Sequence, residues 1–193
     1  AMVVIENCND LDDVLEVNKA LLDELKDSHL ANVRLVGGEQ MNVRDLLFCL
    51  LLCSAADASL VLAENFGGSV AGFVDMMNAK AAELELKDTH FVNTHGLDAE
   101  GHYSTARDMA RLAEYAIADP LFGDIVSTAE YTVGATNKSK ERKLKTSNLL
   151  ISEKSDYYYK WADGVKTGYT DDAGRCLCST AMKDGVRYIC IVL

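Results

Sequence analysis

The spacing of apolar residues changes near Tyr131, and this change most constrains the fold of the 193-residue chain. Up to about Phe122, apolar side chains recur every three or four positions, which is the period of amphipathic helices. After Tyr131, short β-branched runs alternate between apolar and polar residues, as strands with one buried face do. The pattern predicts an α+β fold, in which a helical cluster at residues 11–122 packs on an incomplete antiparallel sheet within residues 131–193.

The helical part carries recognisable start and stop signals. Helices are predicted over residues 43–52, 56–66, 70–84 and 102–118. Their expected N-caps are, in order, Asn42, Ser54 or a neighbour, Ser69, and Ser104 or Thr105. Pro120 is expected to close the last helix, because proline lacks the N–H that a helix interior needs. Residues 33–43 alternate around Gly37-Gly38 and predict a short hairpin.

The strand part begins after a polar stretch. Strands are predicted within residues 165–167, 175–181 and 186–193. Asp184-Gly185 lies between the last two and suits a tight antiparallel turn. The polar stretch TNKSKERKLKTSN, residues 136–148, holds most of the local positive charge but no aromatic residue, and is expected to be a solvated loop.

The overall charge limits the kinds of partner. Thirty acidic and nineteen basic residues give a formal net charge of −11. This field repels phosphate backbones and anionic bilayers, so nucleic acid is not an expected partner. The longest apolar run, LLFCLLLC, is too short to span a membrane, and no signal peptide is recognised in the chain.

The cysteines and histidines do not predict a metal centre. The six cysteines are at positions 8, 49, 53, 176, 178 and 190, without a C-x-x-C pair. Cys49 and Cys53 are four positions apart, as expected for small apolar side chains on one buried helix face. His90, His95 and His102 match no familiar zinc spacing. We therefore expect neither a disulfide framework nor a metal or other cofactor.

Lys166-Thr167-Gly168 is the stretch with the clearest chemistry. It lies in a predicted strand, where an ammonium beside a hydroxyl can hold a carboxylate. Gly168 has no side chain to keep the backbone of a ligand away from the strand. Three residues alone are a weak signal, and by themselves they are more often explained by a surface lysine near a turn.

Longer segments raise the weight of this motif. They are LLFCLLLCSAADASLVLAENFGGS, MMNAKAAELELKDTHFVNTHGLD, GHYSTARDMARLAEYA and DGVKTGYTDDAGRCLCSTA. In this order they resemble the D-alanyl-D-alanine carboxypeptidases, which are low-molecular-mass penicillin-binding proteins related to serine β-lactamases. That family carries the motifs S-x-x-K, S-x-N and K-T-G. The resemblance spans essentially the whole chain and implies a β-lactamase/transpeptidase-like fold over residues 1–193.

The resemblance also implies roles for particular residues. Ser54 matches the serine of the second motif and would relay a proton toward the leaving amine. Lys166, Thr167 and Gly168 match the third motif, and with Thr170 they would engage the terminal carboxylate of the substrate. The N–H of Tyr169 would be one oxyanion donor. The implied substrate is a peptidoglycan stem peptide ending in D-Ala-D-Ala, cleaved through an acyl-enzyme. The full-length relative would bind β-lactams, and its location would be the cell envelope.

The first motif is missing from the chain. No S-x-x-K occurs in the 193 residues. Ser104 begins a similar spacing that ends in Arg107, but an arginine cannot give up its proton to act as a base. MVVIE, residues 2–6, resembles the end of the family's first-motif helix. The nucleophile is therefore expected just upstream of the chain, which resembles a domain truncated at both ends and is expected to be inactive by itself.

Two positions within the chain also bear on activity. Ala56 stands where the second motif has asparagine, so an oriented amide is absent. Removing one such polar donor lowers rates by about two to three orders of magnitude in other enzymes. His95, in NTHGLD, matches a loop of the family and is expected to be structural rather than catalytic.

Two alternatives to an enzyme remain open. The chain can be a non-catalytic relic of the fold that binds peptidoglycan peptides or protein partners, with Ala56 as a sign of decay. It can also be a helical scaffold without a binding groove, a reading that the K-T-G strand disfavours. In either case an incomplete sheet would leave an unpaired strand edge, so self-association through that edge is expected.

Overall fold

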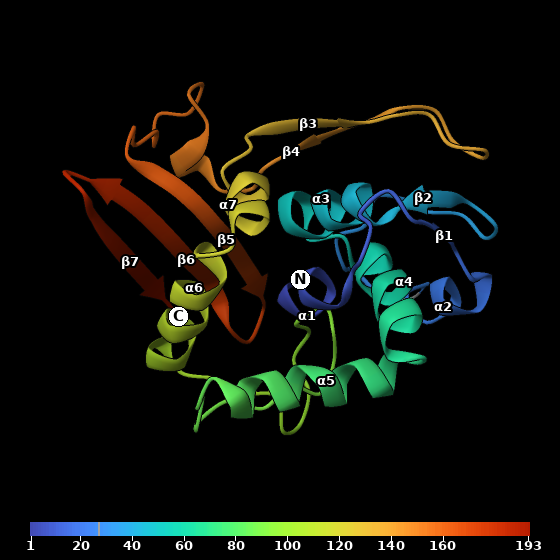
Figure 1. The fold of residues 1–193 in the computed structure, drawn as a ribbon, viewed down its shortest axis with the longest axis horizontal. Helices are drawn as coiled ribbons and strands as arrows, with labels where there is room; N and C mark the ends of the chain where they lie inside the picture. Colours follow the sequence, from blue (N-terminus) through green and yellow to red (C-terminus); the bar gives the residue numbers. More distant parts are fainter. Residues whose placement is uncertain (27) are drawn as a thin grey trace.

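The computed structural model describes residues 1–26 and 28–193 as helices packed beside antiparallel sheets (Figure 1). The helices are α1 (Met2–Asn7), α2 (Lys19–Asp23), α3 (Val43–Cys53), α4 (Ala56–Gly67), α5 (Val70–Glu83), α6 (Ala106–Ile117) and α7 (Pro120–Val126), with a 3-10 turn at Leu149–Ile151. The strands are β1 (Val14–Glu16), β2 (Gln40–Asn42), β3 (Glu130–Val133), β4 (Arg142–Lys145), β5 (Ala162–Thr170), β6 (Gly174–Lys183) and β7 (Val186–Val192). The predicted α+β class is confirmed.

The three-stranded sheet β5-β6-β7 lies on one side of the molecule and helices α3 and α4 lie on the other (Figure 1). The main core surrounds α3, where Leu46, Leu47 and Leu52 are at most 1% exposed. A smaller cluster joins α1, α6 and α7 to the sheet through Met2, Ala116, Phe122, Val126 and Val165. Burial of large apolar side chains therefore holds the helical part against β5.

Three predicted helix caps are confirmed. The side-chain oxygen of Asn42 accepts the N–H of Asp45 at 2.7 Å, and the hydroxyl of Ser69 accepts that of Gly72 at 3.0 Å. Of the two candidates for α6, Thr105 is the cap. Each satisfies an N–H that has no partner inside the helix, and such a cap is typically worth about 1 kcal/mol.

The structure refines two boundary predictions. Of Ser54 and its neighbours, Ala55 holds the N-cap position of α4, without a side-chain hydrogen bond. Ser54 adopts a left-handed conformation (φ 55°, ψ 36°) that ends α3. α6 ends at Ile117, before Pro120, and Pro120 is itself the first residue of α7, which Asp119 caps. A proline is well accepted there, because the first N–H of a helix needs no intrahelical partner.

The prediction of a hairpin over residues 33–43 is wrong. β2 pairs with β1, with Leu15 opposite Met41, and not with the preceding residues. The carbonyl groups of Val33 and Arg34 instead accept hydrogen bonds from the guanidinium of Arg142. The partner of these two carbonyls is therefore the side chain of Arg142, and not a neighbouring strand of a hairpin.

Part of the stretch predicted as a solvated loop is a strand. β4 pairs with β3 in a hairpin that reaches over α3 (Figure 1). Val133 and Leu144 are buried on its inner face, and the ring of Tyr131 stacks on Phe48 with centroids 3.6 Å apart. Lys143 and Lys145 lie on the outer, exposed face of β4 on either side of Leu144. In so short a strand they hide the alternation of buried and exposed residues from the sequence analysis.

The three predicted strands of the main sheet are confirmed, and they form one antiparallel sheet in which β6 pairs with both β5 and β7. Asp184 and Gly185 form the two-residue turn between β6 and β7, with φ angles of 52° and 77°. Both positive angles fit the tight hairpin turn that Asp-Gly favours. β5 and β7 are the two edges of this sheet.

β5 approaches α7 closely at Gly164. Its φ of +154° lies where side chains are rarely accepted, and a Cβ atom there would be only 2.8 Å from Cγ2 of Val126. Only glycine fits this position without displacing one of the two elements. The contact sets how deeply β5 lies against the helices.

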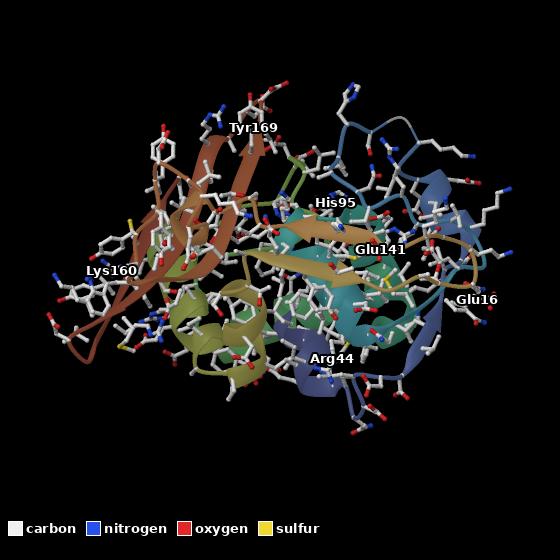
Figure 2. The ribbon with its side chains drawn as sticks, turned by 90° about the horizontal axis from the view of Figure 1, so that it is seen from above. Glu16, Arg44, His95, Glu141, Lys160 and Tyr169 are labelled. Carbon is white, nitrogen blue, oxygen red and sulfur yellow. The ribbon has the colours of Figure 1, made fainter. Side chains whose placement is uncertain are left out.

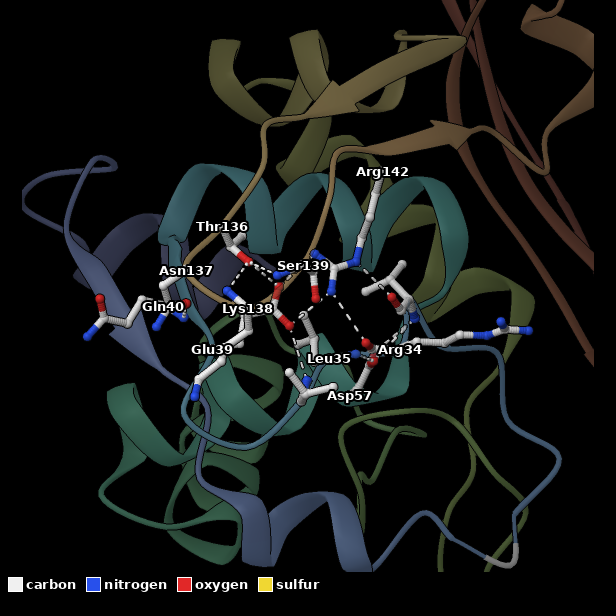
Figure 3. Close-up of polar contacts among 12 residues, drawn as sticks. Arg34, Leu35, Glu39, Gln40, Asp57, Thr136, Asn137, Lys138, Ser139 and Arg142 are labelled. Carbon is white, nitrogen blue, oxygen red and sulfur yellow. Dashed lines mark hydrogen bonds and ion pairs between the residues drawn. The ribbon is translucent and has the colours of Figure 1, made fainter.

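A buried ion pair fastens the β3-β4 hairpin to the helical part (Figure 3). Arg142 donates to both carboxylate oxygens of Glu39, at 2.7 and 2.9 Å. Glu39 is fully buried and also accepts the hydroxyl proton of Thr136. Beside it, the carboxylate of Asp57 in α4 accepts the N–H of Leu35 at 2.9 Å. Each buried charge therefore has partners, as burial requires.

Candidate functional site

Ser54 and Lys166 meet where the helical part contacts the main sheet. The Nζ of Lys166, in β5, donates a hydrogen bond to the Oγ of Ser54, at the end of α3. It also donates to the backbone oxygen of Thr167 at 2.9 Å. The structure thus brings together residues from the second and third motifs. We call Ser54, Lys166 and Thr167 the candidate site.

The backbone around Ser54 fixes its side chain. The N–H of Ser54 donates to the carbonyl of Cys49, which closes the last turn of α3. Two residues later, the N–H of Ala56 donates to the carbonyl of Ala31 at 2.8 Å. A left-handed serine is uncommon, and these bonds compensate for its conformational cost. Ser54 is therefore held in the turn between two helices rather than on a flexible loop.

Burial changes the acidity of Lys166. Desolvation lowers the pKa of its ammonium to about 8, against a small opposing effect of the Cys53 thiol. A cavity of about 260 Å³ adjoins the lysine and is lined mainly by apolar side chains, including Met77, Phe91 and Val165. An amine in such surroundings is protonated at neutral pH but loses its proton more readily than an exposed lysine.

Thr167 has a partner that the sequence analysis missed. Its hydroxyl lies 2.5 Å from the hydroxyl of Ser147, which belongs to the segment after β4. The N–H of Ser147 donates to the carbonyl of Leu52 near the end of α3, at 3.3 Å. Ser147 lies in the polar stretch expected to be a loop, and no motif or spacing there distinguishes it.

Gly168 is not required by the packing of the chain itself. A Cβ atom at this position would meet only Cβ of Cys176, at an ordinary 3.6 Å. β5 is an edge strand, so alternate N–H and carbonyl groups along it point away from β6. A side chain at residue 168 would restrict access to that edge without clashing inside the protein.

Tyr169 and Thr170 continue the strand away from the candidate site. Figure 2 shows Tyr169 at one end of the sheet, directed into solvent, and its hydroxyl donates to Asp171 at 3.0 Å. The hydroxyl of Thr170 donates to Asp98 at 3.1 Å and accepts the N–H of Ala173. Thr170 therefore ties the loop around Asp98 to β5, and its hydroxyl already has partners on both sides.

Ala56 follows Ser54 by two positions, and His95 lies in the loop that contains Leu97. Ala56 is 1% exposed, as the first residue of α4. The Nδ1 of His95 accepts the N–H of Leu97 in its own loop at 3.3 Å. Burial, followed by the nearby His102, lowers the pKa of His95. The contact with Leu97 holds His95 within its own loop.

The described residues contain no group of three or more His, Cys, Asp or Glu side chains placed to hold a metal ion. The six cysteines are all free thiols. In the part of the chain that the structure describes, no helix combines the length and apolar character needed to cross a membrane.

Comparison with known proteins identifies one family. The family model described as D-alanyl-D-alanine carboxypeptidase matches residues 1–193. The chain is 41% identical over 155 residues to the D-alanyl-D-alanine carboxypeptidase DacF of Bacillus subtilis (strain 168), a match covering 80% of this chain and 38% of the relative. It is 32% identical over 204 residues to the D-alanyl-D-alanine carboxypeptidase of Streptomyces sp. (strain K15), covering 100% of this chain and 68% of that protein.

Solved structures agree with these matches. The DD-transpeptidase of Streptomyces K15 superposes with a TM-score of 0.90 at 32% identity, over 98% of this chain and 75% of that one. Penicillin-binding protein 5 of Haemophilus influenzae gives a TM-score of 0.81 at 31% identity, over 95% of this chain and 51% of its own. The chain thus shares the fold of these proteins, although it spans well under half the length of DacF.

Proposed function

The chain belongs to the D-alanyl-D-alanine carboxypeptidase family, as its motifs predict, and we propose that its candidate site binds peptides ending in D-Ala-D-Ala. In a protein that also carries the nucleophile, this binding would present the terminal peptide bond for cleavage by a serine-type acyl-transfer reaction. The substrate would be the stem peptide of peptidoglycan, and β-lactams would compete for the same place.

The contact between Lys166 and Ser54 carries this proposal. One residue comes from a helix end and the other from a sheet edge, 112 positions apart in the sequence. A cation, hydroxyl groups and an open strand edge in one place are what recognition of an extended peptide with a C-terminal carboxylate needs.

Each residue has a distinct role in the proposal. The ammonium of Lys166 and the hydroxyl of Thr167 hold the carboxylate, and Gly168 leaves room for the peptide backbone against β5. The N–H of Tyr169 faces the carbonyl of the bond to be cleaved and stabilises its developing negative charge. Ser54 passes a proton toward the departing amine, which it can do because Lys166 orients its hydroxyl. Thr170 supports the end of the strand through Asp98.

The acyl-enzyme step is not assigned to any residue of this chain. Its 193 residues contain no Ser-x-x-Lys, and Ser104 lies at the start of α6 beside its cap Thr105. Ala56 leaves the second motif without its amide. In a protein that supplied the nucleophile, the missing amide would slow acylation by about two to three orders of magnitude.

A non-catalytic function is the alternative, and Ala56 favours it. A protein with the same site but without an effective second motif would bind stem peptides without cleaving them. The sequence of the coding DNA upstream of the chain distinguishes the enzyme from the non-catalytic binding protein. An in-frame Ser-x-x-Lys supports the enzyme, and a closed frame supports the binding protein. The family acts on the cell wall, so either form is proposed to work outside the cytoplasm.

We propose in addition that copies of this chain associate through β7. Among the described residues β7 pairs only with β6, and its other edge is open. Val186, Tyr188 and Val192 are about half exposed, at 50%, 57% and 49%. Natural edge strands usually carry charges that prevent pairing, but the one charged residue of β7, Arg187, is paired with Asp163.

Binding of short peptides tests the proposed function. The purified chain is titrated with an N-acetylated tripeptide ending in D-Ala-D-Ala and with its L-Ala-L-Ala counterpart, followed by calorimetry. We expect saturable binding of the first and not of the second. Equal binding of both, or of neither, contradicts the proposal.

A penicillin tests the assignment of the acyl step. Incubation of the chain with the drug, followed by intact mass measurement, should give no added mass, because no activated serine is present. A stoichiometric adduct on Ser54 or Ser104 would contradict this assignment. It would place the nucleophile inside the chain.

A further inference from the structure

The hydroxyl of Ser147 faces the candidate site from a segment that no motif includes. It lies 2.5 Å from the hydroxyl of Thr167, near the short end of the range for O–H···O bonds. Ser147 is exposed and Thr167 is partly buried. The pair therefore sits at the surface of the site, where a ligand can reach it.

The backbone holds Ser147 firmly in this position. Its own N–H donates to the carbonyl of Leu52, close to Ser54 in the chain. On its two sides, the N–H of Thr146 donates to the carbonyl of Ala129, and the N–H of Asn148 donates to the hydroxyl of Thr146. The segment is thus tied to α3 and to the start of β3, and the hydroxyl of Ser147 is preorganised.

The hydroxyl pair of Ser147 and Thr167 has one proton that it can donate to a ligand. Each hydroxyl has one proton to donate, and a single proton lies between the two oxygens. The other proton is then free to point away from the pair, toward a ligand. Either hydroxyl can be the donor within the pair, so the free proton can come from Ser147 or from Thr167, whichever lies nearer to the carboxylate.

The electrostatic surroundings favour an anion. The ammonium of Lys166 bonds to the backbone oxygen of Thr167, so a positive charge lies beside the hydroxyl pair. Hydrogen bonds to a charged acceptor are about twice as strong as bonds between neutral groups. A carboxylate would therefore gain more from the pair than a neutral amide would.

We propose that Ser147 is a substrate-binding residue, whose hydroxyl joins that of Thr167 in holding the C-terminal carboxylate of the peptide. This inference rests on the proposed function, and it assigns one more residue to the specificity of the site. It makes recognition of the free carboxylate depend on a segment of the β4-β5 connection as well as on β5.

The test compares two forms of one peptide. The N-acetylated tripeptide ending in D-Ala-D-Ala and its C-terminal amide are each titrated into the chain by calorimetry, and the ratio of the two dissociation constants is taken. Wild-type protein should prefer the acid. Ser147→Ala should reduce this preference about tenfold, the usual scale for one hydrogen bond to a charged group. It should leave binding of the amide nearly unchanged.

Two matched control variants are measured beside Ser147→Ala. Ser147→Thr keeps a hydroxyl and should retain most of the preference. Ser127→Ala removes an exposed hydroxyl at the end of α7 and should change nothing. Thermal unfolding of each variant checks that the fold is intact. A general loss of folding would weaken both peptides alike, whereas a lost carboxylate contact changes only the ratio.

The possible outcomes separate the inference from the proposed function. If wild-type protein prefers the acid and Ser147→Ala retains the full preference, the inference is overturned and the proposed function stands. If wild-type protein binds neither peptide, or binds both equally, the proposed function fails and the inference fails with it. If the preference for the acid over the amide is reduced in Ser147→Ala but not in the two control variants, the result supports both the inference and the proposed function.

Discussion

The ammonium of Lys166 donates a hydrogen bond to the hydroxyl of Ser54, joining a sheet edge to the end of a helix. Because burial lowers the pKa of this lysine to about 8, the charge of the site changes within an accessible pH range. We therefore expect peptide binding at the candidate site to depend on pH in a way that an exposed lysine would not cause.

Peptide affinity should fall as the pH rises through about 8 to 9. The protonated amine attracts the carboxylate, and the attraction is lost when the amine is neutral. Bound carboxylate stabilises the ammonium, so the pKa of Lys166 is higher in the complex than the value of about 8 in the free protein. Calorimetric titrations between pH 6.5 and 10 check this. Lys166→Arg stays charged throughout and should bind with little pH dependence, and a flat wild-type profile would contradict the prediction.

The same lysine affects stability with a definite sign. Its pKa is lower in the folded chain than in the unfolded chain, so the folded state disfavours the proton. The resulting destabilisation is fully present below about pH 8 and disappears as the pH rises through the unfolded value of about 10.4. Lys166→Met should therefore unfold at a higher denaturant concentration than wild type at pH 7, while losing preference for the acid peptide.

Arg142→Ala should lower the free energy of unfolding by about 3 to 5 kcal/mol, the usual cost of leaving one partner of a buried ion pair alone. Glu39 is fully buried and would keep its charge without a counter-ion. Urea denaturation measures the change. Lys143→Ala, on the exposed face of the same strand, is the matched control and should have little effect.

Acid should weaken this ion pair. Burial alone would raise the pKa of Glu39, but its bonds to Arg142 and Thr136 outweigh burial and lower it. The stabilisation is present above the unfolded pKa, about 4.3 for a glutamate, and is lost as the pH falls through the lower folded value. Arg142→Ala should consequently lose less stability than wild type over that acid range.

Ala56→Asn should destabilise the fold by about 1 to 3 kcal/mol, the range for overfilling a packed core. Ala56 is 1% exposed, so the larger amide must displace neighbours or turn toward the site. Ala56→Ser adds a single oxygen and should cost less. If urea denaturation finds Ala56→Asn as stable as wild type, the turn has room for the amide that the family carries there.

Self-association through β7 predicts a concentration-dependent mass. Sedimentation velocity of the wild-type chain should show dimers or larger species, because the open edge of β7 is largely uncharged. Tyr188→Lys places a charge on that strand and should favour the monomer. Tyr103→Lys is the control, since Tyr103 is 56% exposed but distant in sequence from the sheet. A wild-type monomer at every concentration would contradict the proposal.

Local signals predicted most of the fold. Asn42, Ser69 and Thr105 act as caps because a helix end can be satisfied by one nearby side chain. The Asp184-Gly185 turn is similarly local, and it brings β6 and β7 together. The switch from helical to alternating period placed the main sheet correctly, because period depends on which face of each element is buried.

The failures involve residues that are distant in sequence. Residues 33–36 form no hairpin, because Arg142 binds the carbonyls of Val33 and Arg34 from more than a hundred positions away. Ser147 was missed for the same reason, since its importance comes only from its distance to Thr167. The motifs indicated Ser54 and Lys166 as site residues, but their contact also depends on α7, which packs against both α3 and β5.

Gly164 has a further consequence for the chemistry of the lysine. It leaves only backbone between β5 and Val126 of α7, and Lys166 follows two residues later, about 7 Å along the strand. We therefore expect the volume of the side chain at position 126 to influence how far the amine of Lys166 is withdrawn from water. A larger or smaller residue at position 126 would tune the basicity of Lys166 from outside the site, while every group that touches the substrate stayed the same.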